Sequence, residues 1–182
     1  ADSAPDALSR RLKRGLAVVQ RRSQALTRFM RAYARLARLP PPTLGAVDVS
    51  AWVERVIPLE TRLSVAVGGG EAVKVRGDSD QLEQLLINLV RNGVDAALAV
   101  EHGEVQVHWH ATPQFVQLVV ADNGPGIADA DNLFVPFFTT KPDGSGIGLA
   151  LCRQIAEAHG GTLTLNNRAD AGCESRLRLP RW

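Results

Sequence analysis

The sequence is short of several residue types, and each shortage argues against a class of protein. Its two cysteines, Cys152 and Cys173, are too few for a disulfide-built secreted domain and lack the spacing of a metal site, so we expect both to be reduced packing residues. No apolar run approaches the roughly 20 residues that span a bilayer, and no signal-peptide pattern stands at the start. We therefore expect a cytoplasmic setting, with any membrane anchor carried by other segments of a longer protein.

The composition is otherwise that of an ordinary globular protein. Hydrophobic residues make up 45% and charged residues 22% of the 182 residues, which is enough for one good core with an appended element. The first residue is Ala1 rather than Met, so we expect a fragment of something longer.

Positive charge is concentrated near the start. Residues 1–42 hold ten Arg and Lys against two Asp, whereas residues 43–182 hold eleven against seventeen Asp and Glu. An arginine-rich helix could attract nucleic acid or anionic lipid, but the interleaved aromatic residues of such surfaces are missing. A solvated helix face is the favoured interpretation, and we expect no nucleic-acid partner.

One long helix is predicted for residues 6–39, ended by three prolines at residues 40–42. Its heptad seam consists of two series, which are Leu12, Val19, Leu26 and Tyr33, and then Leu16, Ser23, Met30 and Ala37. Such a seam has to be buried, and Gly15 and Ser23 suit a four-helix bundle better than a two-stranded coil. We expect residues 1–42 to form this helical piece and residues 43–182 to form a separate domain.

Helices and strands alternate after the prolines. Asp78, with Gln81 three residues later, has the pattern of a capping box at the start of a helix. Helices are predicted for residues 51–58, 79–100 and 148–159, and extended segments for residues 47–49, 62–67, 72–75, 104–109, 115–121, 162–165 and 175–179. Because most strands form antiparallel hairpins, the pattern predicts an α+β fold, a two-layer α/β sandwich.

The segment VVADNGPGI, residues 119–127, ends a strand on a carboxylate and then turns to glycines. Asp, Asn, Gly and Pro are the residues that turns prefer, so a plain turn is one interpretation. The other is a close approach of the backbone to a ligand, with Asp122 as its polar anchor. The segment alone favours the turn.

Two further segments carry polar groups that suit a nucleotide. Asn88, Asn92 and Asp95 share one face of a helix, where they either cap a neighbouring loop or face phosphates and a hard cation. The segment GSGIG, residues 144–148, opens a helix whose free N–H groups suit a polyphosphate, and Lys141 precedes it in a short loop. It is neither a P-loop nor a dinucleotide fingerprint, because Lys-Ser/Thr does not follow the glycines and no strand precedes them.

Together these segments resemble a known family. The asparagine-bearing helix, DNGPGI, the aromatic-anchored loop FVPFFTTK and GSGIGL occur in the order and spacing of the histidine-kinase ATP-binding domain. That family shares its Bergerat (GHKL) fold with gyrase, mismatch-repair and heat-shock-chaperone ATPases. The resemblance covers residues 47–180, and FFTTK and RLARLPPP look most like the nitrogen-regulation branch of sensor kinases. It implies that the long helix is the second helix of the dimerisation and phosphoacceptor hairpin.

The resemblance implies roles for the matched residues. Asp122 would accept a hydrogen bond from the adenine amino group, and Asn92 would ligate Mg²⁺, with Asn88 near the phosphates and Asp95 as a weaker, outer partner. The glycines would cradle the phosphates beneath a lid that carries Lys141. The expected ATP contacts are Asn88, Asn92, Asp95, Asp122, Gly124, Gly126, Ile127, Lys141, Gly144, Ser145, Gly146, Ile147, Gly148 and Leu149.

Two departures from the family bear on function. Hydrolytic relatives place a glutamate where this chain has Asn88, and an amide cannot take a proton from water, which favours holding ATP for transfer to a protein acceptor. Gly93 stands where the family usually has Ala, at a helix cost of about 1 kcal/mol. A close approach of the nucleotide and a packed neighbour are two explanations for this glycine.

The family's phosphorylated histidine is missing. None of the four histidines is followed by an acidic residue and Arg-Asn-Pro, so we expect the acceptor helix outside this chain or on another one. His108 and His110 have the spacing of a metal pair, but an ordinary strand face is favoured. The four histidines are His102, His108, His110 and His159.

Three functions remain to be compared. The leading hypothesis is the ATP-binding catalytic part of a sensor histidine kinase, which uses Mg²⁺ and ATP, works as a homodimer and passes phosphate to a response-regulator receiver domain. As given, the chain would bind Mg·ATP without phosphorylating itself. The alternatives are a GHKL-fold ATPase that drives conformational work, and a non-catalytic dimerisation or scaffold module with a vestigial pocket.

Overall fold

The structure, a computed structural model, describes residues 39–129, 131–141 and 144–182, together with scattered residues between positions 13 and 34. These scattered residues have helical backbone and belong to the predicted helix 6–39. Its other residues up to position 38 lie outside the described residues, and Leu39 is not helical. Within the described part of the chain, no helix combines the length and apolar character that crossing a membrane requires.

A mixed five-stranded sheet forms one layer, in the order β2-β4-β5-β7-β6. Here β2 runs parallel to β4, and the other neighbours pair antiparallel. The strands are β2 (Val65–Gly69), β4 (Val105–Ala111), β5 (Phe115–Asp122), β6 (Thr162–Asn167) and β7 (Cys173–Pro180). A separate antiparallel ladder joins β1 (Gly45–Asp48) to β3 (Lys74–Gly77).

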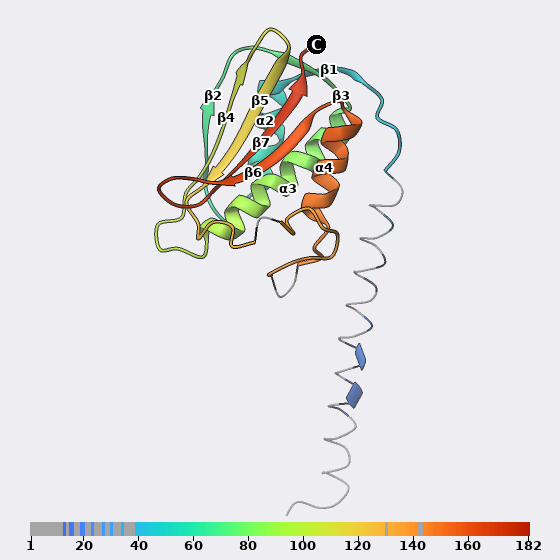
Figure 1. The fold of residues 1–182 in the computed structure, drawn as a ribbon, viewed down its shortest axis with the longest axis vertical. Coiled ribbons are helices and arrows are strands. Elements are labelled where there is room, and N and C mark those ends of the chain that lie inside the picture. The colour runs from blue at the N-terminus through green and yellow to red at the C-terminus, as the bar shows by residue number, and fades with distance from the viewer. Residues whose placement is uncertain are drawn as a thin grey trace, which may run out of the picture.

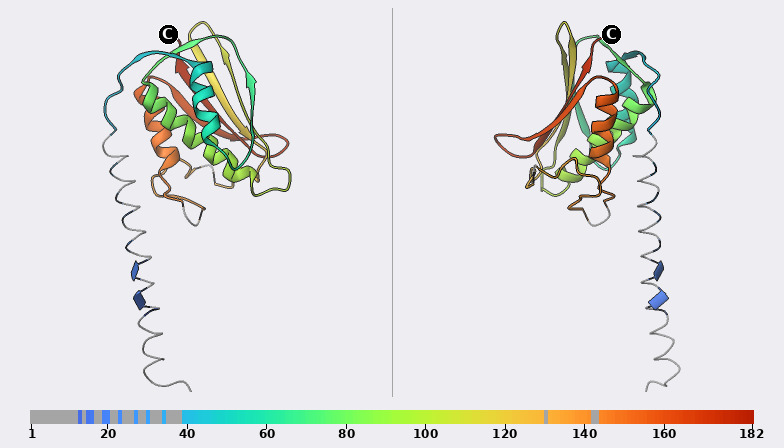
Figure 2. Two further views of the ribbon diagram at one scale, coloured as in Figure 1. Left: turned by 180° about the vertical axis from the view of Figure 1, so that it is seen from behind. Right: turned by 45° about the vertical axis from the view of Figure 1, so that its right-hand side comes forward.

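The helices form the second layer on one face of the large sheet (Figure 1, Figure 2). They are α2 (Val49–Val56), α3 (Ser79–Ala97) and α4 (Gly148–Ala158), with the short 3-10 helix η1 (Ile57–Leu59) after α2. The predicted two-layer α/β sandwich is therefore confirmed. Element ends shift by a few residues, as at β2, where Arg62 and Glu60 bind each other in the preceding turn rather than extending the strand.

The core lies between the two layers. Apolar residues at helical spacing along α3, among them Leu82, Leu85, Leu86 and Leu89, are at most 1% exposed. In β7 the buried leucines alternate with exposed arginines, as expected for a strand with one covered face. This packing fixes the ends of α3, β5 and α4, which carry the predicted site.

The start of α3 differs from the predicted capping box. Asp78 Oδ1 accepts hydrogen bonds from Asp80 N and Gln81 N, both at 3.1 Å, so the cap itself is formed. The Gln81 side chain, however, donates to Pro40 O at 3.0 Å rather than to the cap. The Asp78 N–H is instead donated to Nε2 of the buried His159, at 2.9 Å, because the end of α4 packs there.

Candidate nucleotide-binding site

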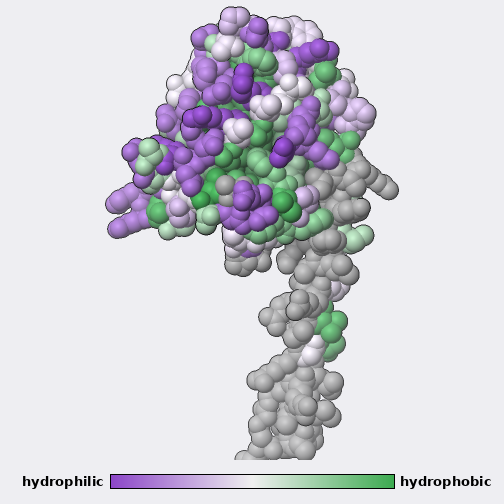
Figure 3. All heavy atoms as spheres, in the orientation of Figure 1, coloured by the Kyte–Doolittle hydropathy of each residue, from purple (hydrophilic) through white to green (hydrophobic). Residues whose placement is uncertain are grey.

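The predicted site residues gather at one edge of the domain. There β5 ends, α3 makes its last turns and α4 begins, and the loop between β5 and α4 crosses this edge (Figure 1). Figure 3 shows hydrophobic residues beside hydrophilic ones where the loop crosses. Its aromatic residues Phe137 and Phe138 are 37% and 39% exposed, whereas Phe134 packs against the core. The expected anchoring of the loop by aromatic residues thus falls mainly on Phe134.

Asp122 ends β5 as a carboxylate that is only 6% exposed. Its Oδ1 accepts hydrogen bonds from Gly124 N at 2.9 Å and Cys173 N at 3.3 Å. Burial raises the pKa of Asp122, and these two bonds oppose the shift without cancelling it. Within the described residues its Oδ2 accepts no hydrogen bond, which leaves one carboxylate oxygen available to a ligand N–H.

The turn after Asp122 packs directly on α3. A Cβ at Gly124 would lie 2.6 Å from the carbonyl oxygen of Ala96, so glycine is required there by the helix as well as by any approaching base. Gly126 has φ +78°, a conformation that favours glycine. The half-buried Ile127 follows it. The contact with Ala96 brings the carboxylate end of the site next to the polar stripe of α3.

Asn88, Asn92 and Asp95 form the predicted stripe and are all half-buried. Asn88 faces the start of α4, because a Cβ at Gly148 would lie 3.9 Å from its Oδ1. Lys141 reaches over from the loop and donates to Asp95 Oδ2 at 2.6 Å and to Asn92 Oδ1 at 3.3 Å. Both interpretations of the stripe therefore have support, since it binds the loop and offers oxygens to a cation.

Asp95 lies in an ion-pair network that the sequence did not predict. Besides Lys141, it accepts from Arg62 Nη1 at 2.6 Å, and Arg62 also binds Glu60. Burial alone would raise the pKa of Asp95, but the Lys141 ammonium and the Arg62 guanidinium outweigh it and hold the pKa below its usual value. Asp95 is thus ionised at neutral pH and holds the lysine of the loop against α3.

The glycines before α4 interlock with the aromatic part of the loop. Phe137 N donates to Gly146 O at 2.8 Å, and a Cβ at Gly146 would lie 2.5 Å from the Phe137 carbonyl carbon. Both residues have positive φ, +71° at Phe137 and +66° at Gly146. A Cβ at Gly144 would also lie 2.4 Å from Thr139 Oγ1. Close packing within the loop therefore requires glycine at Gly146, where the neighbour is backbone, whereas at Gly144 the nearest atom is the end of a side chain.

The first turn of α4 offers backbone donors rather than side chains. Its N-cap, Ile147, makes no side-chain capping bond, so the first N–H groups of the helix stay available for an anion. The Ile147 side chain is 3% exposed and lies in the core, and the Leu149 side chain packs against the core. Any contact of these two predicted residues with ATP would therefore come from their backbone. Ser145 is exposed.

A divalent cation fits this site only with help from phosphate oxygens. In the described ranges no cluster of three or more His, Cys, Asp or Glu could hold a metal ion. The Asn92 amide oxygen already faces the Lys141 ammonium, so it lies where a positive charge is favourable. His108 and His110 lie two residues apart on β4, opposite Val119 and Gln117, and the ordinary strand face that was favoured over a metal pair stays a prediction.

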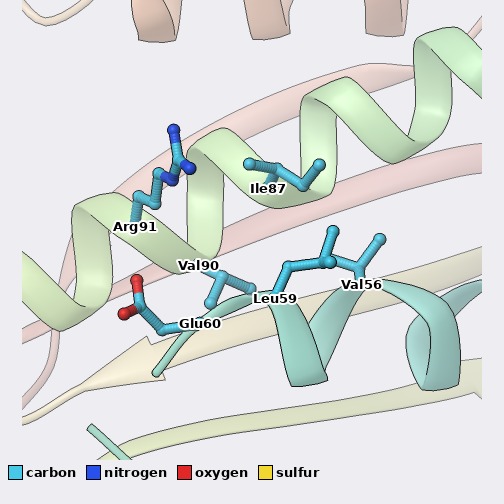
Figure 4. A pocket seen from close by; sticks show the side chains of 6 residues that line it. All are labelled: Val56, Leu59, Glu60, Ile87, Val90 and Arg91. Atoms are coloured by element: carbon cyan, nitrogen blue, oxygen red, sulfur yellow. The ribbon is translucent and has the colours of Figure 1, made fainter. Parts of the chain in front are cut away.

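A shallow hollow lies elsewhere on α3, between that helix and the end of α2. Figure 4 shows its six lining side chains, with Ile87 across from Val56 and Leu59. Glu60, Val90 and Arg91 complete the lining, and none of the predicted ATP contacts takes part. The hollow is therefore separate from the candidate nucleotide site.

Sequence reasoning missed the residues that support Asp122 from the β6–β7 hairpin. Arg168 Nη1 donates to Asp122 O at 3.1 Å, and a Cβ at Gly172 would lie only 2.0 Å from that oxygen. Asn167 binds the backbone of Ile127. The only signal in the sequence is a run of turn-forming residues between two strands, which predicts a hairpin but not what it touches.

Comparison with known proteins identifies the family. The family of histidine kinase-, DNA gyrase B- and HSP90-like ATPases matches residues 77–182. The sensor histidine kinase ZraS of Escherichia coli (strain K12) is 32% identical over 165 residues, which cover 84% of this chain and 35% of ZraS. This chain thus spans about a third of the length of that relative.

Solved structures show the same fold. The mycobacterial sensor histidine kinase MprB superimposes with a TM-score of 0.67 at 29% identity, over 76% of this chain and 98% of the MprB chain. Full-length ShkA, solved in complex with AMPPNP, gives a TM-score of 0.73 at 25% identity over 92% of this chain and 38% of that chain. The chain belongs to the family of histidine kinase-, DNA gyrase B- and HSP90-like ATPases, as the ATP-binding catalytic domain of a sensor histidine kinase.

Proposed function

We propose that this domain holds Mg·ATP and transfers its γ-phosphoryl group to a histidine on an acceptor helix outside the chain, for relay to an aspartate of a response-regulator receiver domain. The observation that carries the proposal is the contact between the Asp122 turn and the last turn of α3, at Gly124 and Ala96. It supports the proposal because it brings the Asp122 carboxylate, proposed to bind the base, and the α3 stripe, proposed to face the phosphates, to one edge of the domain. The complex of ShkA with AMPPNP supports a nucleotide as the ligand.

The residues of this chain would bind ATP and orient its phosphates. Asp122 Oδ2 accepts the adenine amino N–H, while the free N–H groups at the start of α4 donate to phosphate oxygens. Lys141 leaves Asp95 and Asn92 to pair with the phosphates when ATP enters. Because Asn88 cannot act as a general base, the bound triphosphate is preserved until an imidazole nitrogen attacks the γ-phosphorus and ADP leaves.

Asn92 would hold Mg²⁺ on the triphosphate, with Asn88 near the phosphates. Magnesium prefers oxygen ligands and usually keeps phosphate and water in its shell, so one or two amide oxygens suffice. The ion would neutralise phosphate charge and fix the orientation of the triphosphate group of ATP. The Asn92 amide oxygen that would hold the ion accepts a hydrogen bond from the Lys141 ammonium in this structure, so Lys141 would have to leave that oxygen.

The intact protein would be a homodimer through a hairpin to which residues 1–42 contribute the second helix, with residues 43–182 as the catalytic domain. Leu16, Val19 and Met30 of the heptad seam are 55–67% exposed, as expected for a stripe that another helix covers. Since ATP is the phosphoryl donor, the domain would work in the cytoplasm.

Transfer in trans tests this proposal. The chain is mixed with the histidine-bearing acceptor hairpin of its own full-length protein and γ-labelled ATP. We expect acid-labile phosphate on the hairpin and none on the chain itself, and we expect Asp122→Asn to slow the transfer strongly at limiting ATP. Label that appears on the chain alone, or rapid release of free phosphate in place of transfer, would contradict the proposal.

A further inference from the structure

One side chain outside the predicted motifs holds the turn after β5. Asn167, the last residue of β6, accepts a hydrogen bond from Ile127 N through Oδ1 at 2.6 Å and donates one from Nδ2 to Ile127 O at 2.9 Å. These partners fix the orientation of the amide, because an N–H requires the oxygen and a carbonyl requires the NH₂ group. Asn167 therefore pairs with Ile127 through both of that residue's backbone groups.

The turn has few other restraints at this end. Pro125 has no N–H, Gly126 is in the positive-φ region, and within the described residues the backbone of Ile127 finds no partner besides Asn167. The other end of the turn is held by the side-chain amide of Asn123, which belongs to the DNGPGI segment itself. Asn123 accepts from Glu104 N at 2.7 Å and donates to the carbonyl of the neighbouring loop. The turn is thus held by two asparagine side chains, one on each side.

The hairpin that carries Asn167 also backs the Asp122 carboxylate. Cys173 N donates to Asp122 Oδ1, Arg168 donates to Asp122 O, and Gly172 comes so close to that oxygen that only glycine fits. One rigid hairpin therefore touches both the carboxylate and the residue that follows the glycine turn. The spacing between Asp122 and Ile127 is set by the hairpin as well as by the turn.

We propose that Asn167 is a positioning residue for the nucleotide base. By holding Ile127 and the turn in place, it keeps the wall of the base site at a fixed distance from Asp122 before ATP arrives, so binding does not have to order the turn. This inference rests on the adenine-binding role proposed above for Asp122. Asn167 touches no reacting atom.

The test is Asn167→Ala in the full chain, with Asn166→Ala as the matched control. Asn166 is exposed, lies on the other face of β6 and makes no side-chain hydrogen bond among the described residues. Losing two hydrogen bonds should raise the Kd of Mg·ATP by roughly three- to thirtyfold in a calorimetric titration. Asn166→Ala should bind as the wild type does.

Two further readouts separate positioning from a loss of stability. Asn167→Asp keeps the acceptor for Ile127 N but not the donor, so its Kd should fall between those of the wild type and Asn167→Ala. The selectivity for ATP over GTP should fall in Asn167→Ala, and the melting temperature should fall only by the small amount expected for two lost hydrogen bonds. Equal ATP affinity in the wild type and Asn167→Ala overturns the inference, and so does weaker binding with unchanged selectivity for ATP over GTP.

The same titration separates this inference from the proposed function. If the wild type binds Mg·ATP and Asp122→Asn loses it, the proposed site stands whatever Asn167 does. Unchanged binding in Asn167→Ala then overturns the positioning role alone. If the wild type itself binds no ATP, the proposed function fails and the positioning role fails with it.

Discussion

Asp122 is a carboxylate that the fold buries against the preference of its charge. The fold buries it to 6% exposure and raises its pKa, which means that the ionised form is disfavoured in the folded state. Two backbone N–H groups hold one of its oxygens and compensate part of that cost. The carboxylate therefore fits a role in ligand binding better than a role in stabilising the fold.

Asp122→Asn should separate these two effects. An amide oxygen can still accept from Gly124 and Cys173, so the turn is kept, but the amide NH₂ would face the adenine amino group. We expect ATP affinity to fall about 10- to 100-fold, as for loss of a charge-assisted hydrogen bond, and thermal stability to stay equal or to rise. Titration with ATP and thermal unfolding check the two parts.

The stability difference between Asp122→Asn and the wild type should depend on pH with a definite sign. Because the folded-state pKa of Asp122 is raised, the wild type loses stability as pH rises through that pKa, whereas the asparagine variant does not. The variant's advantage should therefore be absent at pH below the ordinary aspartate pKa and full near neutrality. Chemical denaturation at several pH values measures it, and an advantage that shrinks with rising pH would contradict the account.

At the scale of elements, two glycines near the same helix should behave oppositely. A Cβ at Gly93 in α3 would meet only the Val105 and Val120 side chains, at 3.5 and 3.7 Å, which are ordinary contacts. Of the two explanations for this glycine, close approach of a nucleotide is not supported, because the Gly93 position faces the sheet. Gly93→Ala should stabilise the fold by about 0.5–1 kcal/mol and leave ATP affinity unchanged.

Gly124→Ala is the matched contrast. Its Cβ would meet the backbone oxygen of Ala96 at 2.6 Å, and a helix backbone cannot yield as a flexible side chain can. We expect a destabilisation of about 1–3 kcal/mol together with weaker ATP binding. Urea unfolding of both variants measures these changes. A destabilised Gly93→Ala, or a neutral Gly124→Ala, would show that the packing of α3 is described incorrectly.

The cap of α3 offers a second test at this scale. Asp78 accepts hydrogen bonds from two N–H groups of the first turn and from Thr43 N, at 2.8 Å, in the segment before β1. Asp78→Ala should cost about 1–2 kcal/mol. Asp80→Ala, in the same turn but without a side-chain hydrogen bond in the described structure, should change stability little. Equal effects from the two variants in thermal unfolding would contradict the role of the cap.

The elements and their layers were predictable from the sequence, whereas the contacts between distant segments were not. Periodic leucines predicted α3, alternating residues predicted β4 to β7, and the glycine-rich turns predicted the candidate site. The bonds from Asn167 to Ile127, from Arg62 to Asp95 and from Asp78 to His159 span 40, 33 and 81 residues. Such pairings depend on the three-dimensional packing, and no local propensity or periodicity encodes them.

The boundary between the two expected pieces of the chain is a question for the whole molecule. Leu39 packs against the core and Pro40 O accepts from Gln81, so the described domain begins slightly before residue 43. If residues 1–42 form a separate helical piece, limited trypsin digestion should leave a resistant fragment that begins at Leu39. This fragment should keep the ATP affinity of the full chain. Primary cleavage at Arg55, inside α2, would contradict this division.

In this account Asp122 binds the base of ATP and Asn92 binds its metal-bound phosphates. Calorimetric titration with ATP, with and without Mg²⁺, tests this most directly. We predict that the wild type binds ATP more tightly with Mg²⁺, that Asn92→Ala removes this gain, and that Asp122→Asn weakens binding under both conditions. Wild-type protein that binds no ATP, or an Asp122→Asn variant that binds it as well as the wild type, would contradict the account.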